Sequence, residues 1–249
     1  MSDNFYDKVA KKFGNYHTDA KYSTEYPNGN PEEIFRKKLL EVSGKDKIVL
    51  DSGCADGRFT LSISSYFKEI IAIDISKGML DSANALKTEK GIINVNFKYM
   101  DVHKINQPDE SFDVIYSRRG PTDYPGFNRL LKQEGYYVEI NIGEKDAQGI
   151  KEVFQRGQNY GEWNDPKLPK ITNKLKENGF YIAFAKDCLY NEYYTSYEDL
   201  DLFLQGVPIF TDFDSVKDKE LLQKYVEKFQ TEKGIQLSRH RLVIVAQKK

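Results

Sequence analysis

The stretch IVLDSGCADGRFT, residues 48–60, decides the fold class of this chain. Its first three residues form a short apolar run of the kind found in buried strands, and a polar turn follows from Asp51. Phe59, Ile63 and Phe67 then recur every four residues, which predicts a helix directly after the turn. A buried strand, a glycine turn and a helix in this order are typical of a parallel sheet covered by helices.

The same alternation of strand and helix continues along the chain. Apolar segments predict further strands at 69–74, 95–100, 112–117, 136–142, 180–185 and 241–247. Helix-period segments separate most of these strands, and the clearest amphipathic helix, at 222–229, precedes the last one. We therefore predict an α/β fold that is doubly wound around a seven-stranded, mostly parallel sheet.

Two segments fall outside this alternation. Residues 1–29 are polar and rich in aromatic side chains, and residues 186–238 form a long helical excursion between the last two strands. We predict that both are lids over a core made of residues 30–185 and a last core strand at 239–249, because additions to an α/β core usually lie over its ligand crevice.

Composition limits the class of protein. The 249 residues include 37 Lys+Arg and 38 Asp+Glu, a formal net charge of −1, which disfavours a dedicated nucleic-acid binder. No apolar run approaches the roughly 18 residues of a membrane helix, and acids stand near the N-terminus where a secretory signal would be apolar. Cys54 and Cys188 are too few for a disulfide framework or a Cys₄ zinc site. We expect a cytoplasmic protein with no membrane contact and no metal site.

Three aspartates each follow a predicted strand: Asp51, Asp74 and Asp101. Because the carboxyl ends of neighbouring parallel strands border one crevice, we expect these carboxylates to meet there. Gly53 and Gly57 would let the backbone approach a ligand closely. Asp74 comes 23 positions after Asp51, close to the roughly 20-residue spacing at which an acid accepts both ribose hydroxyls. The pattern predicts a nucleoside site.

The sequence of the turn disfavours a dinucleotide as the ligand of this predicted site. It lacks the G-x-G-x-x-G pattern, and the carboxylates of Asp51 and Asp56 would repel a diphosphate. S-adenosylmethionine carries a ribose, an adenine, an ammonium and a sulfonium but no phosphate, and it fits better. A single aspartate at a strand end is more often a helix cap than a ligand. Three of them in order, with a glycine turn after the first, make chance a poor explanation.

Four segments, IVLDSGCADGRFT, IIAIDISKGML, YMDV and SFDVIYS, resemble the successive motifs of class I S-adenosylmethionine-dependent methyltransferases. The resemblance covers about residues 1–145, and the final RHRLVIVAQKK resembles the antiparallel seventh strand of that family. It implies a Rossmann-like methyltransferase fold and S-adenosyl-L-methionine as the cofactor. Ala55 departs from the family, which usually has a glycine there.

The resemblance also implies roles for individual residues. Asp51 and the two glycines would hold the methionine moiety, Asp74 the ribose and Asp101 the adenine amino group. Met79 would pack on the adenine, although ordinary helix core explains a methionine there equally well, and the Val102 backbone would lie at the ring. The full set expected at the cofactor is Asp51, Gly53, Ala55, Gly57, Asp74, Ile75, Met79, Asp101, Val102 and Ser117.

Residues 117–125 follow the fourth strand, and in the family this segment faces the methyl group. It lacks the (Asn/Asp/Ser)-Pro-Pro-(Tyr/Phe) pattern, and neither cysteine is placed as a cytosine C5 nucleophile, so both absences disfavour nucleobase chemistry. Arg118 and Arg119 are expected on the substrate side together with Tyr16. The arginine pair could hold a carboxylate or phosphate of the substrate or of the methionine end of the cofactor, or form a surface salt bridge.

Methyl transfer from a sulfonium is an in-line displacement that needs alignment and exclusion of water. A general base matters only if the acceptor must lose a proton early. The candidates by position are His17, Asp123, Tyr124 and Glu144, and the sequence singles out none of them. His103 and His240 are expected to have no catalytic duty.

Aromatic residues crowd the segments outside the predicted core, as suits a pocket for a small organic acceptor. RNA bases stack on the same residue types, so RNA stays possible as the partner, although the chain has no basic surplus. We expect a methyltransferase acting on a small organic acceptor. The alternatives are an rRNA or tRNA methyltransferase, a nicotinamide-dependent reductase and a non-catalytic nucleoside-binding protein. The sequence predicts no oligomeric state.

Overall fold

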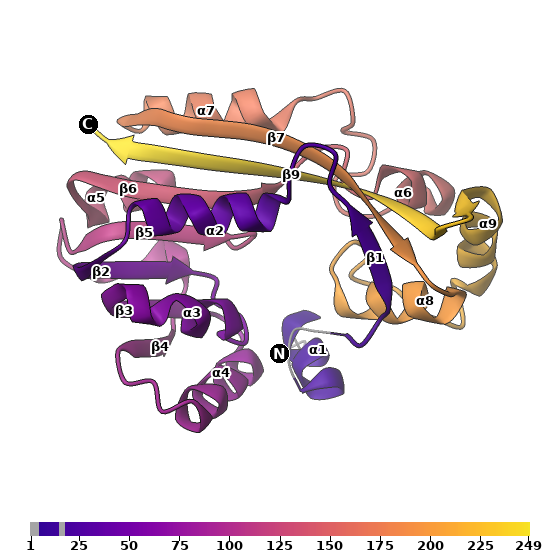
Figure 1. Ribbon diagram of the computed structural model, residues 1–249, viewed down its shortest axis with the longest axis horizontal. Coiled ribbons are helices and arrows are strands. Elements are labelled where there is room, and N and C mark those ends of the chain that lie inside the picture. Colours follow the sequence, from indigo (N-terminus) through magenta and orange to yellow (C-terminus); the bar gives the residue numbers. More distant parts are fainter. Residues whose placement is uncertain (1–4, 15–17) are drawn as a thin grey trace.

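A twisted sheet with helices on both faces forms the centre of the protein (Figure 1). The computed structural model describes residues 5–14 and 18–249. The strands run in the order β1-β7-β9-β6-β5-β2-β3-β4, and the short β8 pairs with β9 beside this path.

Five strands of the core are parallel to one another. They are β4 (Val95–Tyr99), β3 (Phe67–Asp74), β2 (Gly44–Ser52), β5 (Phe112–Arg118) and β6 (Leu131–Ile142). The sheet order places β2 between β3 and β5, so the carboxyl ends of these three strands share one edge. The prediction of a doubly wound, mostly parallel sheet is confirmed.

Helices cover both faces of this core. On one face, α2 (Pro31–Glu41), α3 (Arg58–Ile63) and α4 (Lys77–Glu89) contribute Phe35, Leu39, Leu61, Ile63 and Leu80 to a cluster around Val49 and Val114. On the other face, α5 (Tyr124–Leu130) and α7 (Lys167–Glu177) contribute Phe127, Leu130 and Leu175 to a cluster around Leu50 and Ile115. Because both faces are buried there, the middle segments of the central strands are apolar, such as Ile48–Leu50 of β2 and Val114–Tyr116 of β5.

The sheet has nine strands, so the predicted count of seven is wrong. The additions are β1 (Tyr22–Glu25), antiparallel to β7 at the edge, and β8 (Gln230–Thr231). Neither addition contains an apolar run, and β1 is held by main-chain pairing with β7, which leaves no hydrophobic pattern to detect. The antiparallel last strand is confirmed, because β9 (Gly234–Lys248) runs antiparallel to β6.

The expectation of a helical insertion over 186–238 is wrong at both of its ends. Residues 186–194 continue β7 (Phe180–Tyr194), and residues 234–238 already belong to β9, so the last strand starts before 239. These two long strands pair from Phe180–Lys248 to Tyr194–Ile235 and extend beyond the core (Figure 1). Tyrosines fill much of this extension, and their high strand propensity explains why the segment is a strand.

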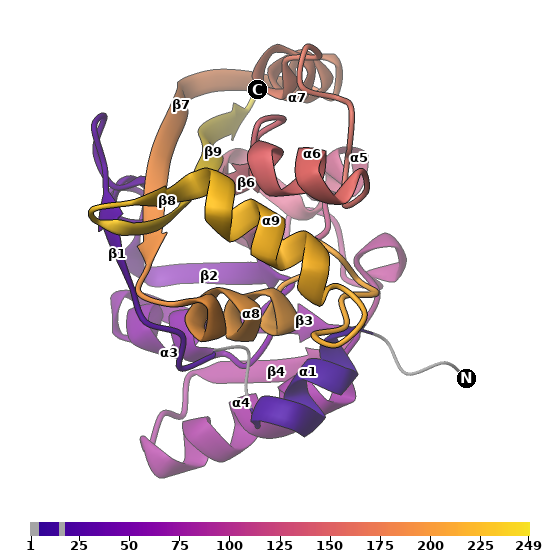
Figure 2. The ribbon, with the colours of Figure 1, turned by 90° about the vertical axis from the view of Figure 1, so that its right-hand side faces the viewer.

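A helical group packs at the far end of the long strands, as Figure 2 shows from that side. It comprises α6 (Gln148–Phe154), α8 (Tyr197–Gly206) and α9 (Lys219–Phe229). Their buried side chains join those of the strand ends in one cluster that includes Phe154, Leu200, Leu204, Phe210, Tyr225 and Leu237.

The N-terminal helix α1 (Phe5–Phe13) lies against α4 rather than against the sheet (Figure 2). Val9 and Ala10 pack on Met79, which is fully buried. None of the helices in residues 5–14 and 18–249 is long and apolar enough to cross a membrane. The cytoplasmic location stays a prediction.

A buried ion network joins the turn after β6 to the two long strands. Arg239 Nε donates to Asp146 Oδ1 at 2.9 Å, and its Nη1 donates to Glu192 Oε2 at 2.7 Å. Arg241 Nη1 donates to the same Asp146 oxygen at 2.5 Å. Burial alone would raise the pKa of Asp146, but the two guanidinium groups hold it well below its usual range. The network thus ties both long strands to the turn after β6.

Replacing Arg239 tests this role. Arg239→Ala leaves Glu192 and part of Asp146 buried without their cation, which should lower the free energy of unfolding by about 3–5 kcal/mol in urea titrations. Lys233→Ala is the matched control, because its ion pair with Glu25 is exposed and should leave stability nearly unchanged. Equal losses in the two variants would contradict the proposed role of the network.

Candidate active site

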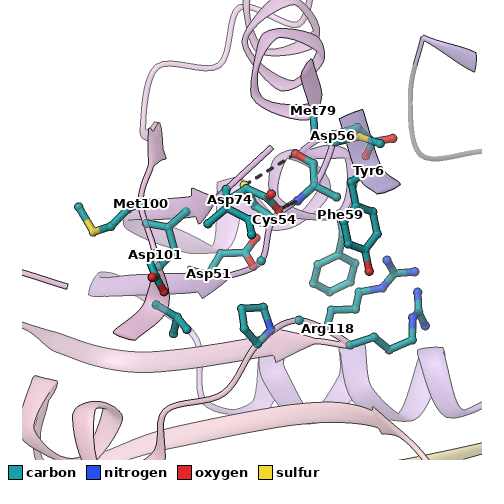
Figure 3. Close-up of a pocket in the computed structure, with 18 of the residues that line it drawn as sticks. Tyr6, Asp51, Cys54, Asp56, Phe59, Asp74, Met79, Met100, Asp101 and Arg118 are labelled. Carbon is teal, nitrogen blue, oxygen red and sulfur yellow. Dashed lines mark hydrogen bonds between the residues drawn. The ribbon is translucent and has the colours of Figure 1, made fainter. Parts of the chain in front are cut away.

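A cavity of about 760 Å³ opens at the carboxyl ends of β2, β3 and β5, within the size range of small-molecule sites. Its walls come from the turn after β2, the ends of β3 and β4, the segment after β5 and helix α1. The cavity is lined by Tyr6, Asp51, Gly53, Cys54, Ala55, Asp56, Arg58, Phe59, Ile73, Asp74, Ile75, Met79, Met100, Asp101, Val102, His103, Arg118, Arg119, Gly120 and Pro121, most of which are drawn in Figure 3.

Asp51 ends the apolar run of β2 and is 2% exposed. Thr60 Oγ1 and Tyr116 Oη both donate to its Oδ2, at 2.5 and 2.6 Å. Burial raises the pKa of Asp51 to about 6, although these two hydroxyl groups act in the opposite direction. Because a carboxylate held by neutral donors keeps its negative potential, Asp51 favours a cation in the cavity.

Asp74 ends β3 and holds the neighbouring turn in place. Its Oδ2 accepts from the Ala55 N–H and its Oδ1 from the Ser76 N–H, both at 2.9 Å. Burial raises the pKa of Asp74, while the backbone N–H groups act against this. The bond to Ala55 holds that residue at a φ of 46°, in the left-handed region that favours glycine. This geometry explains why a glycine would be the easier choice at the position.

The two glycines of the turn are required by close packing. A Cβ on Gly53 would lie 2.8 Å from Pro121 Cδ, and one on Gly57 would lie 2.5 Å from the Phe97 ring. Gly57 does not line the cavity, so its place among the cofactor residues is not supported. Ser117 is also outside the lining, because it is buried beneath the Gly120 backbone.

Asp101 lies at the opposite end of the cavity from Arg118 (Figure 3). Its Oδ1 accepts from the His103 N–H at 3.0 Å, so it caps the short turn at Val102–Lys104 while also lining the cavity. Met79 and Met100 line the cavity as well. Met79 also contacts α1 and is buried, so it belongs to the core, and its packing on an adenine stays a prediction. An aspartate beside apolar side chains suits a nucleobase.

Arg118 and Arg119 form the basic end of the cavity, and both bond Glu32 at the start of α2. Arg118 Nε donates to Glu32 Oε2 at 2.9 Å, and Arg119 Nη1 donates to Oε1. Burial would raise the pKa of Glu32, but the two guanidinium groups lower it to about 2, so it is ionised at neutral pH. Nothing in the sequence around Glu32 indicated this contact, which joins residues 86 and 87 positions apart.

Three of the candidates for a general base belong to the described residues, and none of the three lines the cavity. Asp123 caps α5 by accepting from the Gly126 N–H, and the Tyr124 hydroxyl donates to the buried Glu139 at 3.3 Å. Glu144 accepts from the Lys167 N–H and is likewise absent from the lining. The structure thus gives no support to these three candidates, because each side chain bonds a residue that does not line the cavity. His17, and the substrate-side Tyr16, lie outside the described residues.

Several lining residues had not been predicted. Tyr6 is brought to the cavity by the packing of α1 on α4, a contact between distant segments that leaves no local signal. Met100 directly precedes Asp101 at the end of β4, so its proximity was detectable from the same motif. His103 also lines the cavity.

Comparison with known proteins agrees with this arrangement. Residues 49–135 match the family model described as a methyltransferase domain. The chain is 32% identical over 139 residues to the uncharacterized methyltransferase YcgJ of Bacillus subtilis, covering 48% of this chain and 55% of YcgJ. It is 32% identical over 172 residues to the uncharacterized methyltransferase C70.08c of Schizosaccharomyces pombe, covering 60% and 65%. The chain thus spans under two thirds of these relatives.

The fold agrees as well. The crystal structure of Bacillus subtilis YcgJ superposes with a TM-score of 0.63 at 17% identity, over 87% of this chain and 99% of that one. Residues 49–135 therefore carry a methyltransferase domain, and the predicted resemblance to methyltransferases is confirmed. The subfamily is not resolved by these matches.

The environment of Asp51 can be tested directly. Tyr116→Phe removes one hydroxyl donor that favours the charged carboxylate, so the pKa of Asp51 should rise from about 6 by on the order of one unit. The measurement is a pH titration of aspartate carboxyl carbons by NMR. Tyr181→Phe, at an exposed position on β7, is the control. An unchanged pKa of Asp51 in Tyr116→Phe would show that the Tyr116 hydroxyl does not stabilise the charged carboxylate.

Proposed function

We propose that the protein transfers a methyl group from S-adenosyl-L-methionine to a small organic acceptor. The observation that carries this proposal is the convergence of Asp51, Asp74 and Asp101 on one cavity. They come from the ends of β2, β3 and β4, which are consecutive neighbours in the sheet. The methyltransferase domain at 49–135 supports the same conclusion.

The charges of the described cavity residues fit this cofactor. Asp51 and Asp74 are bonded to hydroxyl and backbone donors, and burial raises the pKa of both, so each has electrostatic reason to favour a cation. The ammonium and sulfonium groups of S-adenosylmethionine would supply such a cation. A diphosphate at the same place would be repelled, which argues against a nicotinamide-dependent reductase.

Each end of the cavity then has a role. Asp74 would accept the ribose hydroxyls, and Asp101 with the Val102 backbone would face the adenine. Asp51 and the Gly53 backbone would hold the methionine end. When bound, the cofactor supplies an electrophilic methyl group on its sulfonium. The chain's own contribution is to align the acceptor, and Tyr6 on α1 helps to exclude water.

A small acceptor is favoured over RNA by the charge distribution. The net charge is −1, and Arg118 and Arg119 are both bonded to Glu32 instead of forming part of an open basic face. The cavity has the size of a small-molecule site, which suits an acceptor that enters it whole.

Cofactor binding should depend on Asp74. Loss of charge-assisted hydrogen bonds to the ribose in Asp74→Asn should weaken S-adenosylhomocysteine binding at least about 30-fold in titration calorimetry. Asp109→Asn, a change to an exposed loop carboxylate, should leave the affinity unaltered. An Asp74→Asn affinity equal to that of the unaltered protein would remove the ribose assignment. Absence of any binding to the unaltered protein, even at millimolar ligand, would overturn the cofactor.

The acceptor class can be tested in cell extract. With tritiated S-adenosylmethionine, the protein should label compounds that pass a small-molecule filter, and ribonuclease treatment should not reduce the label. Label that stays with large molecules and disappears with ribonuclease would establish an RNA substrate. Cofactor binding without any labelling would favour a nucleoside-binding protein, and tight binding of NADH would favour a reductase.

A further inference from the structure

The basic end of the cavity carries an excess of one positive charge. Arg118 and Arg119 line the cavity, and both bond the carboxylate of Glu32, which is ionised at neutral pH. Two guanidinium groups and one carboxylate sum to +1. The side chains of Arg118 and Glu32 are about one-third exposed, so this charge is accessible from the cavity.

The arginines keep donors for a ligand. A guanidinium has five N–H donors, and the bond to Glu32 occupies the Nε of Arg118. Within residues 5–14 and 18–249, neither Nη1 nor Nη2 of Arg118 forms a hydrogen bond. Two terminal nitrogens of one guanidinium can bind both oxygens of a carboxylate in a planar, forked geometry.

The pair is also held in a fixed position. The Arg118 guanidinium lies over the Phe59 ring with 5.3 Å between Cζ and the ring centre. Arg119 has a φ of 59° and its N–H donates to the Ile140 carbonyl at 2.8 Å, so its unusual backbone is tied to β6. A Cβ on the following Gly120 would lie 2.2 Å from the Ser52 carbonyl, which shows how tightly this segment packs on β2. Preorganised donors lose little entropy when a ligand binds.

The location suits the acceptor. Figure 3 shows Arg118 at the same end of the cavity as Tyr6 and Phe59, away from Asp101 and Met100. Tyr22 of β1 is half exposed, and the charge of Arg119 is near enough to act on the pKa of its phenol. Aromatic faces beside a cationic fork suit a flat organic group that carries an anion.

We propose that Arg118 and Arg119 form a carboxylate-binding fork and that the methyl acceptor is a small organic anion held there by its carboxylate. This proposal rests on the proposed function for the methyl transfer itself. The single negative charge of a carboxylate neutralises the net charge of +1 on Arg118, Arg119 and Glu32, whereas the two charges of a phosphate dianion would leave a net negative charge. Arg58, which also lines the cavity, is already paired with Asp56 and is not part of the fork.

The first test uses benzoate and its neutral analogue benzamide as probes, titrated into the protein with and without S-adenosylhomocysteine and followed by ligand-observed NMR. Benzoate should bind the unaltered protein more tightly than benzamide, and Arg118→Met should weaken benzoate at least about tenfold. Arg118→Lys keeps the charge without the fork, so it should lose less benzoate affinity than Arg118→Met. The control Arg129→Met removes an arginine bonded to Asp109 on another surface and should change nothing.

Two results would overturn the fork. In the first, the protein binds benzoate no more tightly than benzamide. In the second, Arg118→Met and Arg129→Met lose benzoate affinity equally. Unaltered melting temperatures would show that the variants are folded. Because the titration without S-adenosylhomocysteine needs no cofactor, it tests the fork even if the proposed function fails, and lack of S-adenosylhomocysteine binding would identify that separate failure.

A second test distinguishes the carboxylate of the acceptor from that of the cofactor. If the fork holds the acceptor, Arg118→Met should bind S-adenosylhomocysteine within about threefold of the unaltered protein. A loss for S-adenosylhomocysteine but not for 5′-methylthioadenosine, which lacks the amino-acid part, would assign the fork to the cofactor and overturn the proposal. Labelled acceptors from extract should be retained by an anion exchanger, and acceptors found only in its flow-through would also overturn it.

Discussion

A buried carboxylate that forms no ion pair within residues 5–14 and 18–249 is the constraint on which the cavity depends. Asp51 is 2% exposed and is held by the hydroxyl groups of Thr60 on α3 and Tyr116 on β5. Burying a charge is costly unless hydrogen bonds replace its water, so these two donors must stay in place for the fold to tolerate Asp51. The need to satisfy one side chain therefore ties together the helix, the two central strands and the turn that form the floor of the site.

The same requirement gives the cavity two electrostatically different ends. Around the turn, the carboxylates of Asp51 and Asp74 accept from neutral groups, whereas Glu32 at the other end neutralises only part of Arg118 and Arg119. A net charge of −1 for the whole chain hides this separation. Because the opposite signs lie within one cavity, a cationic cofactor and an anionic partner are each attracted to their own place.

The sequence predicted those parts of the protein that depend on neighbouring residues. The central strands are apolar because both faces are buried, and the strand-end aspartates follow from where those strands stop. Contacts between distant segments gave no such signal: β1 pairs through its main chain, Tyr6 arrives with α1, and Glu32 meets the arginines across 86 and 87 positions. Asp123 and Tyr124 are close to the arginines in sequence but do not line the cavity, so closeness along the chain was a poor guide to their place.

This division between local and distant contacts separates the two halves of the site. The residues that face the expected cofactor lie mostly within 49–135, the stretch matched by the methyltransferase domain. Glu32 and Tyr6 at the basic end of the cavity come from outside that stretch, and so do the long strands and their helical group. Similarity to relatives through the shared domain therefore bears on the methyl donor. Inference about the acceptor depends on contacts that reach beyond the matched stretch, of which the Arg118–Glu32–Arg119 arrangement is the best defined.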